Sequence, residues 1–417
     1  MNAEILCIGT EILLGDIVNT NGAFLARQLA QLGIDIYHQS VVGDNADRLR
    51  DALRLALSRA DMVITTGGLG PTYDDITKKT VADYFGVGMV TDEASMRRIK
   101  EFEARINRTV KSNELQAAVP EGSTVFFNEV GFAPGLAIEK EGKTVIMLPG
   151  PPNEMRPMFL NKVVAYLRRG STDTILSKTV HIFGMGESQV EETLRDIMTS
   201  CVNPTVAPYA KFGEVQVRIS AKAPDEEAAR KMIEPVLERI RGRLGDLIYG
   251  IDVGSMHNAV VMSLLEKGHT LAAAESCTGG KLSAAVTDIP GASKVFLGGV
   301  CAYSDAVKRS VLGVSARTLK KYGAVSEQTA FEMAEGIRKI TGADIGVSIT
   351  GIAGPDGGTA EKPVGTVYIS VDSGGYGETK RFMLNRGYGE VRETVRHMSV
   401  LNALSMVLKA AKANQPF

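Results

Sequence analysis

Short apolar runs alternate with longer amphipathic ones over the first 170 residues. Runs such as Met62–Thr65 predict buried strands, whereas Arg48–Ala60 repeats its leucines at helical spacing. The expected strands are Ile5–Ile8, Ile34–Val42, Met62–Thr65 and Thr144–Leu148, and the expected helices are Thr20–Leu32, Arg48–Ala60 and one that ends at Tyr84. This alternation predicts a parallel α/β sheet with helices on both faces, a three-layer domain.

The pattern changes over the next 80 residues or so. The segment VQVRISA alternates apolar and polar side chains, which is typical of a sheet with one wet face. The expected elements are strands at Lys178–Phe183, Glu214–Ala221 and Leu247–Tyr249 and helices at Glu187–Met198 and Asp225–Leu244. We therefore expect a small α+β module.

From about Ser255 the α/β pattern returns. The expected strands are Thr270–Ala274, Phe296–Tyr303, Ile345–Thr350 and Thr366–Val371, and the expected helices are Asn258–Glu266, Lys281–Asp288, Thr329–Thr341 and Val391–Ala410. The chain is thus predicted to hold three domains, at residues 1–170, 171–252 and 253–417.

Charge and cysteine usage exclude several function classes. With 47 basic and 48 acidic residues, no global field attracts the chain to nucleic acid or to an anionic membrane. No apolar run is long enough for a membrane span, and the first residues lack the basic region of a signal peptide. The four cysteines form no CxxC pair and the five histidines show no ligand spacing, so we expect reduced thiols in the cytoplasm.

The stretch AESCTGGK contains the strongest candidate chemistry. It follows a predicted strand and precedes a predicted helix, which places Ser276–Gly280 at a carboxyl edge where α/β folds bind ligands. One interpretation is that the hydroxyls only cap the helix. The other is a catalytic nucleophile, which needs an activating base.

Two further stretches are expected at the same edge. Tyr303 and Lys308 follow the strand-like run FLGGVCAY, and a lysine acts as a base when desolvation lowers its pKa. In SITGIAGPDGGTAEKPVGT, Thr350, Gly351 and Gly354 begin a long loop. That loop could be a flexible hairpin connection, or a binding loop whose glycines let the backbone approach a ligand.

Together, AESCTGG, YSDAVK and SITGIAGPDGGTAEKPVGT closely resemble the nicotinamide-nucleotide amidase domain of CinA-type proteins. The resemblance covers about 160 residues and implies hydrolysis of nicotinamide mononucleotide to nicotinic acid mononucleotide and ammonia, without a cofactor. It implies that Ser276 is the nucleophile and Lys308 its base, with Tyr303 assisting. The implied substrate-binding residues are Thr278, Gly279, Gly280, Thr350, Gly351 and Gly354, with Arg386 or Arg392 for the substrate phosphate. Asn385 stands where the family often has an aspartate, so the choice between the two arginines stays open.

The N-terminal part has its own motif, GGLGPTYDDIT, after a predicted strand. Adjacent carboxylates beside a glycine loop suit a divalent cation that neutralises a pyrophosphate, so Asp74 and Asp75 are candidate metal ligands. Alternatively, the two acids only begin the next helix, where its dipole favours them.

This motif resembles the molybdopterin-binding-like domain of CinA proteins, which extends the resemblance to the full chain. The resemblance implies that the domain hydrolyses ADP-ribose with a divalent metal (Mg, Mn, Co or Ni, undecided), and in that family often with potassium as well. Its implied substrate-binding residues are Gly67, Gly68, Gly70, Asn153 and Glu11. Because the same fold elsewhere binds molybdopterin, a pterin-binding domain without this activity is the alternative.

The middle module is described as KH-like in that family. A nucleic-acid-binding KH domain needs a GxxG loop with basic flanks, and FGMGES does not meet that pattern. We therefore expect a spacer or dimerisation role in a homodimer, without direct nucleic-acid binding. The competing interpretation of the whole chain is a competence-associated interaction protein.

Overall fold

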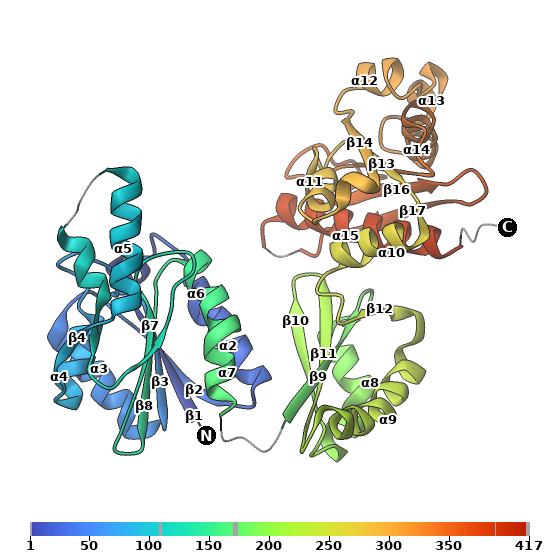
Figure 1. Ribbon diagram of the computed structural model, residues 1–417. Coiled ribbons are helices and arrows are strands. Elements are labelled where there is room, and N and C mark those ends of the chain that lie inside the picture. The colour runs from blue at the N-terminus through green and yellow to red at the C-terminus, as the bar shows by residue number, and fades with distance from the viewer. Residues whose placement is uncertain (1, 108–110, 170–173, 388, 414–417) are drawn as a thin grey trace. The chain divides into compact units, whose positions relative to one another are not determined.

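The computed structural model describes residues 2–107, 111–169, 174–387 and 389–413 (Figure 1). The chain splits into two compact units, Met1–Leu176 with Ala221–Lys231 and Ser177–Ser220 with Met232–Phe417. The domain boundary expected between residues 170 and 171 lies outside the described residues.

The N-terminal domain is built on a six-stranded sheet in the order β2-β1-β3-β8-β7-β6. The first four strands are parallel, as the pattern predicts, and β7 and β6 add an antiparallel edge that the sequence did not reveal. The strands are β1 Asn2–Ile8, β2 Asp35–Val42, β3 Met62–Thr66, β6 Thr124–Phe126, β7 Gly135–Lys140 and β8 Lys143–Leu148, and a small separate pair is β4 Met89–Thr91 with β5 Ala118–Pro120.

Helices cover both faces of this sheet, which confirms the three-layer prediction. Leu25 and Phe159 belong to the apolar core on one face, and Leu53 and Val81 to the core on the other. The helical segments are α1 Thr10–Leu14, α2 Thr20–Gln31, α3 Ala46–Arg59, α4 Thr77–Phe85, α5 Glu93–Ile106, η1 Lys111–Ala117, α6 Pro152–Met158, η2 Phe159–Val163 and α7 Val164–Leu167.

The middle module contains the predicted α+β elements and one strand that sequence reasoning missed. Its sheet has the order β10-β11-β9-β12, and β10 pairs antiparallel with β11. Pro208 lies within β10, which obscures the strand pattern but is tolerated because β10 is an edge strand. The elements are β9 Thr174–Ile182, α8 Glu187–Ser200, β10 Thr205–Lys211, β11 Glu214–Ala223, α9 Glu226–Leu244, η3 Gly245–Leu247 and β12 Ile248–Ile251.

The C-terminal domain has a five-stranded sheet in the order β14-β13-β15-β16-β17. Strands β14, β13 and β15 are parallel, whereas β16 and β17 run antiparallel to their neighbours. The strands are β13 Leu271–Glu275, β14 Phe296–Cys301, β15 Ile345–Gly351, β16 Thr366–Asp372 and β17 Gly377–Met383. The helical segments are α10 Met256–Lys267, α11 Lys281–Thr287, η4 Ala292–Lys294, α12 Asp305–Ser310, α13 Ala316–Tyr322, α14 Glu327–Thr341 and α15 Val391–Ala413.

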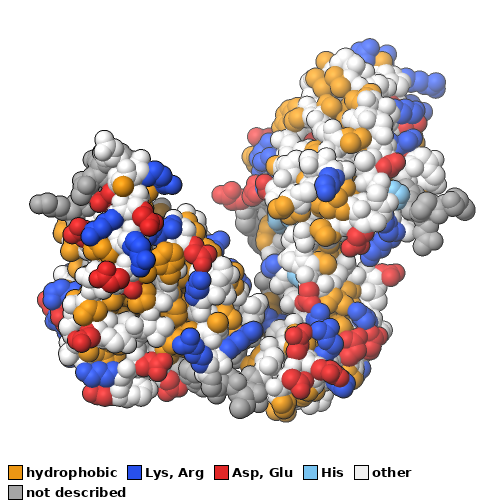
Figure 2. Space-filling model, in the orientation of Figure 1, with side chains coloured by type: hydrophobic (Ala, Val, Ile, Leu, Met, Phe, Trp, Pro, Cys, Tyr) orange, Lys and Arg blue, Asp and Glu red, His pale blue; other side chains and the backbone are white. Residues whose placement is uncertain are grey.

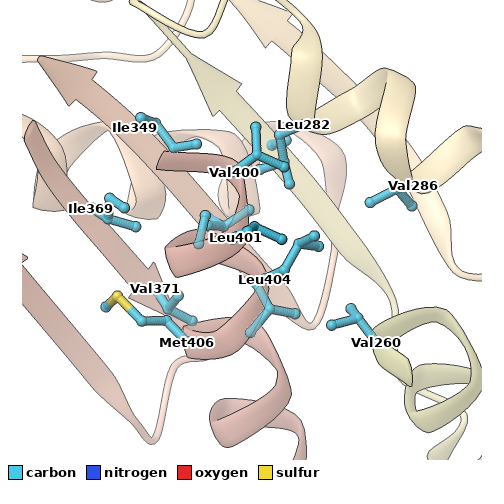
Figure 3. Close-up of a cluster of buried hydrophobic side chains, with 14 of the residues drawn as sticks. Val260, Leu282, Val286, Ile349, Ile369, Val371, Val400, Leu401, Leu404 and Met406 are labelled. Carbon is cyan, nitrogen blue, oxygen red and sulfur yellow. The ribbon is translucent and has the colours of Figure 1, made fainter. Parts of the chain in front are cut away.

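The long helix α15 fixes the core of this domain. Figure 3 shows Leu401 and Leu404 of α15 among side chains of the sheet and of α11, including Ile349 and Leu282. These four side chains are fully buried. Because α15 packs on both the sheet and α11, its register determines where its polar side chains lie.

The surface gives little indication of a large charged partner. On the face seen in Figure 2, basic and acidic side chains are interspersed. Within the described part of the chain, no helix has the length and apolarity needed to cross a bilayer.

Two interior helix glycines should respond oppositely to alanine. A Cβ on Gly336 in α14 would lie 1.9 Å from the Leu312 carbonyl oxygen, whereas nothing lies within 4 Å of a Cβ on Gly242 in α9. We expect Gly242→Ala to stabilise its domain by about 0.5–1 kcal/mol, because alanine restricts the unfolded chain. Gly336→Ala should destabilise its domain by about 1–3 kcal/mol through overpacking. Differential scanning calorimetry would measure both, and equal shifts in the same direction would contradict the packing of α14 on the Leu312 carbonyl.

Candidate functional site

Three strand ends meet at the candidate site of the C-terminal domain. The central strand β13 pairs in parallel with β14 and β15, so that Glu275 lies opposite Cys301 on one side and Ile349 on the other. Parallel pairing therefore brings the segments that follow these strands to one carboxyl edge. They are the segments that the sequence singled out, with Ser276, Lys308 and Thr350.

The turn after β13 holds Ser276 in a fixed position. The Ser276 N–H donates to the Ile349 carbonyl at 2.9 Å, and the Gly279 N–H donates to the Ser276 carbonyl at 3.0 Å. Gly279 and Gly280 have φ angles of 59° and 92°, a left-handed conformation that glycine adopts without strain. Within the described residues, the N–H groups of Cys277 and Thr278 in this turn donate to no other residue, and that of Cys277 lies against its own thiol.

The Ser276 hydroxyl contacts the side chain of Lys308. Its Nζ lies 3.2 Å from Ser276 Oγ and donates to the Ala302 carbonyl at 2.8 Å. The side chain is almost fully buried, and desolvation lowers its pKa, against an opposing contribution from Asp305. A buried lysine with a lowered pKa beside a serine hydroxyl is the arrangement of a nucleophile with its base.

The alternative interpretation, that serine and threonine hydroxyls cap α11, is wrong. The N-cap residue of α11 is Gly280, and no side chain of the cap residue makes a capping bond. The carboxylate of Glu275 satisfies this end of the helix instead, because it accepts from the N–H groups of Gly280, Leu282 and Ser283. Ser276 is therefore free of a capping role.

The two candidate arginines lie in different places. Arg392 Nη1 donates to the Gly354 carbonyl at 2.8 Å, and its Nη2 lies 3.3 Å from the Tyr303 hydroxyl. Arg386 lines a separate cavity of about 330 Å³ together with Lys211 and Glu214 of the middle module. Among the described residues, Arg392 and not Arg386 hydrogen-bonds to the Gly354 loop and to Tyr303. Tyr303 itself is 62% exposed.

Sequence reasoning missed Arg396. Its Nη2 donates to the Thr278 carbonyl at 2.8 Å, so α15 contacts the nucleophile turn directly. The signal was present in the sequence, because Arg392 and Arg396 are four residues apart and four residues separate neighbours on one face of a helix.

Most of the remaining predicted residues of this site have structural contacts within the domain. The Thr350 hydroxyl is buried and donates to the Ala324 carbonyl at 2.7 Å, and the Thr278 hydroxyl is buried without a partner. A Cβ on Gly351 would lie 2.7 Å from Val367 Cγ2, so that glycine lets β15 and β16 pack closely. Because β15 and β16 pair antiparallel, the long loop between them connects a hairpin, and its Gly354 carbonyl binds Arg392.

Cys277 lies next to Ser276 but is a poor nucleophile. Its side chain is 6% exposed, and burial raises the pKa of its thiol to about 12. At neutral pH the thiolate, which is the reactive form, is therefore almost absent.

The glycine motif of the N-terminal domain lies at the carboxyl edge of β1, β3 and β8. A Cβ on Gly67 would lie 2.2 Å from the Ile8 carbonyl oxygen, and one on Gly68 would lie 2.2 Å from Thr77 Oγ1. Both have positive φ, 109° and 68°. Close packing of the strand end and of α4 thus requires these glycines, whatever ligand the loop also binds.

The two adjacent aspartates differ in their surroundings. Asp75 Oδ2 accepts from the N–H group and the hydroxyl of Thr72, at 2.8 and 2.5 Å, and packs against Gly70. Asp74 is exposed. Helix α4 begins at Thr77 with Ile76 as its N-cap, so neither aspartate is the N-cap.

Other side chains at this edge have unequal roles. Glu11 and Asn153 are exposed, at the starts of α1 and α6. Asn21, which sequence reasoning missed, is buried and donates to Thr66 Oγ1 at 3.0 Å and to the Gly150 carbonyl at 2.7 Å. It thereby ties α2 to the end of β3 and to the segment that follows β8.

A metal at this edge would have few protein ligands. The described residues contain no group of three His, Cys, Asp or Glu side chains placed to hold an ion. Mg²⁺ commonly takes one or two carboxylates and completes its shell with water and substrate phosphates, so a site built on Asp74 and Asp75 would depend on ligands from the substrate.

Comparison with known families covers all three domains. Residues 4–169 match the model described as "Probable molybdopterin binding domain", residues 177–250 match "Damage-inducible protein CinA KH domain", and residues 253–411 match "CinA C-terminal domain".

Similar full-length chains are also known. A "CinA-like protein" of Dictyoglomus turgidum is 50% identical over 408 residues, 98% of each chain. A "Putative competence-damage inducible protein" of Clostridium acetobutylicum is 48% identical over 405 residues, 97% of each chain. Among solved structures, the competence/damage inducible protein CihA from Agrobacterium tumefaciens is 37% identical, with a TM-score of 0.36, over 39% of this chain and 96% of that one.

The cysteines should differ in their reaction with iodoacetamide. Cys301 is exposed, whereas burial and a pKa of about 12 leave about one part in 10⁴ of Cys277 as thiolate at pH 8. We expect peptide mass mapping of the folded protein to find Cys301 alkylated and Cys277 protected, and both alkylated in denaturant. Equal rates for the two in the folded protein would contradict the burial of Cys277.

Proposed function

The chain belongs to the CinA family, and from this premise we propose that its C-terminal domain hydrolyses nicotinamide mononucleotide to nicotinic acid mononucleotide and ammonia. The observation that supports the proposal best is the buried Lys308 Nζ at 3.2 Å from Ser276 Oγ. No metal or cofactor takes part in the proposed reaction.

The proposed chemistry has two steps. Neutral Lys308 accepts the Ser276 proton while Oγ attacks the amide carbon, and the lysine then returns a proton to the departing nitrogen as ammonia. Water hydrolyses the resulting acyl-serine to the carboxylate. The N–H groups of Cys277 and Thr278 are suited to the developing oxyanion, where one donor can contribute about 10²–10³ in rate.

Arg392 is the stronger candidate for the substrate phosphate. It shares the site with Tyr303 and the Gly354 loop, and a guanidinium matches a phosphate in bidentate geometry. We assign Tyr303 a role in orienting Arg392, because its hydroxyl lies against that side chain.

For the N-terminal domain we propose hydrolysis of ADP-ribose at the pyrophosphate. Asp74 and Asp75 would hold a divalent cation, whose chemistry is to neutralise the pyrophosphate oxygens; Mg, Mn, Co and Ni all remain candidates, and potassium a further ion. Gly67, Gly68 and Gly70 would line the phosphates, with Glu11 and Asn153 at the same edge.

Two other roles have some support. The family model matched by residues 4–169 is described as molybdopterin-binding, which favours a pterin ligand as the second candidate for that domain. The names of the relatives refer to competence, which fits an interaction protein.

We propose a homodimer in the cytoplasm, where the described cysteines, all free, would stay reduced.

A pair of substitutions separates these functions. We expect Ser276→Ala to abolish ammonia release from nicotinamide mononucleotide, because the nucleophile is removed, and to leave ADP-ribose cleavage unchanged. Asp75→Asn should abolish ADP-ribose cleavage, because it removes a proposed metal ligand, and should leave ammonia release unchanged. A coupled ammonia assay and chromatography of ADP-ribose products measure the two activities. If both variants keep both activities, the assigned residues are wrong; if the wild-type protein with divalent metal shows neither, a binding role replaces the enzymatic one.

The pH dependence of ammonia release should report Lys308. Below the lowered pKa of Lys308 the ammonium form cannot accept the Ser276 proton, so kcat/KM should rise about tenfold per pH unit. It should level off above a pKa that lies below the ordinary lysine value of about 10.4. Lys308→Arg should be inactive throughout, because a guanidinium stays charged. Lys281→Met is the control. Lys281 is the first residue of α11 and forms an ion pair with Glu393, so its loss should leave the pH dependence of kcat/KM as in the wild type. An unchanged profile in Lys308→Arg would eliminate Lys308 as the base.

A further inference from the structure

Glu275 contacts both ends of the turn that carries Ser276. Glu275 is the last residue of β13 and directly precedes Ser276. Its carboxylate reaches over the turn to the start of α11, where Oε2 accepts from the N–H groups of Gly280 and Leu282 at 3.1 and 3.0 Å. Oε1 accepts from the N–H group and the hydroxyl of Ser283, at 2.9 and 2.7 Å.

These four hydrogen bonds are made in a fully buried site. Glu275 is 0% exposed. Burying a carboxylate is costly unless its oxygens are hydrogen-bonded, and here each oxygen has two donors. Three of the donors are N–H groups at the start of a helix, where the dipole also favours a negative charge. The carboxylate is therefore held in one position, and the same hydrogen bonds fix the first turn of α11.

The neighbouring packing is shaped around this contact. A Cβ on Gly299 of β14 would lie 2.3 Å from Ser283 Oγ, so the glycine leaves the space in which that hydroxyl reaches Glu275. Leu282 and Val286 fix the rest of α11 in the apolar core (Figure 3). Apolar packing thus fixes the helix, and the carboxylate fixes the end of the helix relative to β13.

We propose that Glu275 is a positioning residue that sets the place of Ser276, and of the Cys277 and Thr278 N–H groups, relative to Lys308. The inference rests on the proposed amidase function. It also bears on the substrate, because the carboxylate occupies the N–H groups of α11 that would otherwise attract an anion. The start of α11 is therefore not free to bind the anionic group of the substrate, which agrees with the proposed role of Arg392.

Glu275→Gln tests this role. The amide keeps the volume but supplies one acceptor oxygen, and its NH₂ group would face N–H donors that it cannot accept from. We expect kcat for ammonia release to fall about 10²-fold, because a small misplacement of a catalytic group has that effect, while KM changes by no more than about twofold.

Asp344→Asn is the matched control. Asp344 Oδ2 accepts from the N–H group and the hydroxyl of Thr270, at 2.8 and 2.7 Å, directly before the opposite end of β13. Both variants weaken a carboxylate contact at an end of the same strand. Asp344 is exposed and accepts two hydrogen bonds, whereas the buried Glu275 accepts four, so kcat is compared at a temperature where both variants are folded. We expect Asp344→Asn to keep the wild-type kcat. If Glu275→Gln matches Asp344→Asn in kcat at a temperature where both are folded, the positioning role is wrong.

Ser283→Ala serves as a milder variant if Glu275→Gln does not fold. It removes one of the four hydrogen bonds and should lower kcat about fivefold, again without a change in KM. An unchanged kcat in Ser283→Ala would then count against the proposal.

A second measurement separates this proposal from the choice of substrate. A fluorophosphonate probe forms a bond between Ser276 Oγ and phosphorus and releases fluoride, and intact mass reports the rate. Labelling of the wild type without ammonia release would reject the proposed substrate alone, and slower labelling of Glu275→Gln than of Asp344→Asn would still support the positioning role. A wild type that neither releases ammonia nor is labelled would overturn both.

Discussion

The parallel pairing of β13 with both of its neighbours is the constraint from which the C-terminal site follows. Since strand pairing aligns Glu275 with Cys301 and Ile349, the three segments beyond these residues leave the sheet at the same edge. No segment carries the chemistry alone: Ser276 comes from the first, Lys308 from the second and the Gly354 carbonyl from the third. A shift of one residue in this pairing would turn each strand's side chains to the opposite face and disperse the site.

Burial of polar groups then gives the site its chemistry. Lys308 is held by main-chain carbonyls and by Ser276, so its ammonium loses water and its pKa falls. Glu275 is equally buried, but N–H groups and a hydroxyl satisfy its oxygens. The same physical situation, a charged side chain without water, thus makes one residue a candidate base and the other an anchor, and the identity of the partners makes the difference. Cys277 shows the third outcome, because burial raises the pKa of its thiol more than its own N–H group and the nearby Arg396 lower it, which leaves the thiol unreactive.

Much of this could be predicted from the sequence, because strand and helix periodicities are local. The helices α2 and α15 were expected within three residues of their observed ends. Ser276, Lys308 and Thr350 were expected together because each lies at or after the carboxyl end of a predicted strand, and those ends share one edge of an α/β sheet. Features that depend on tertiary contacts were not predictable. Pro208 obscured β10, the antiparallel edges of two sheets had no local signal, and nothing in AESCTGG indicates that Glu275 rather than a hydroxyl satisfies α11. The choice between Arg386 and Arg392 depended likewise on where the chain turns into α15.

The position of α15 links the core of the domain to its site. Leu401 and Leu404 on its apolar face are fully buried against the sheet and α11. Nearer the start of the same helix, Arg396 donates to the Thr278 carbonyl and Arg392 to the Gly354 carbonyl. Both arginines thus contact main-chain oxygens of segments that surround Ser276, and they do so from a helix that cannot slide without opening the core. The next residue, His397, lies 3.0 Å from the Phe212 carbonyl of the β10–β11 turn. The helix that carries Arg392 therefore also contacts the middle module.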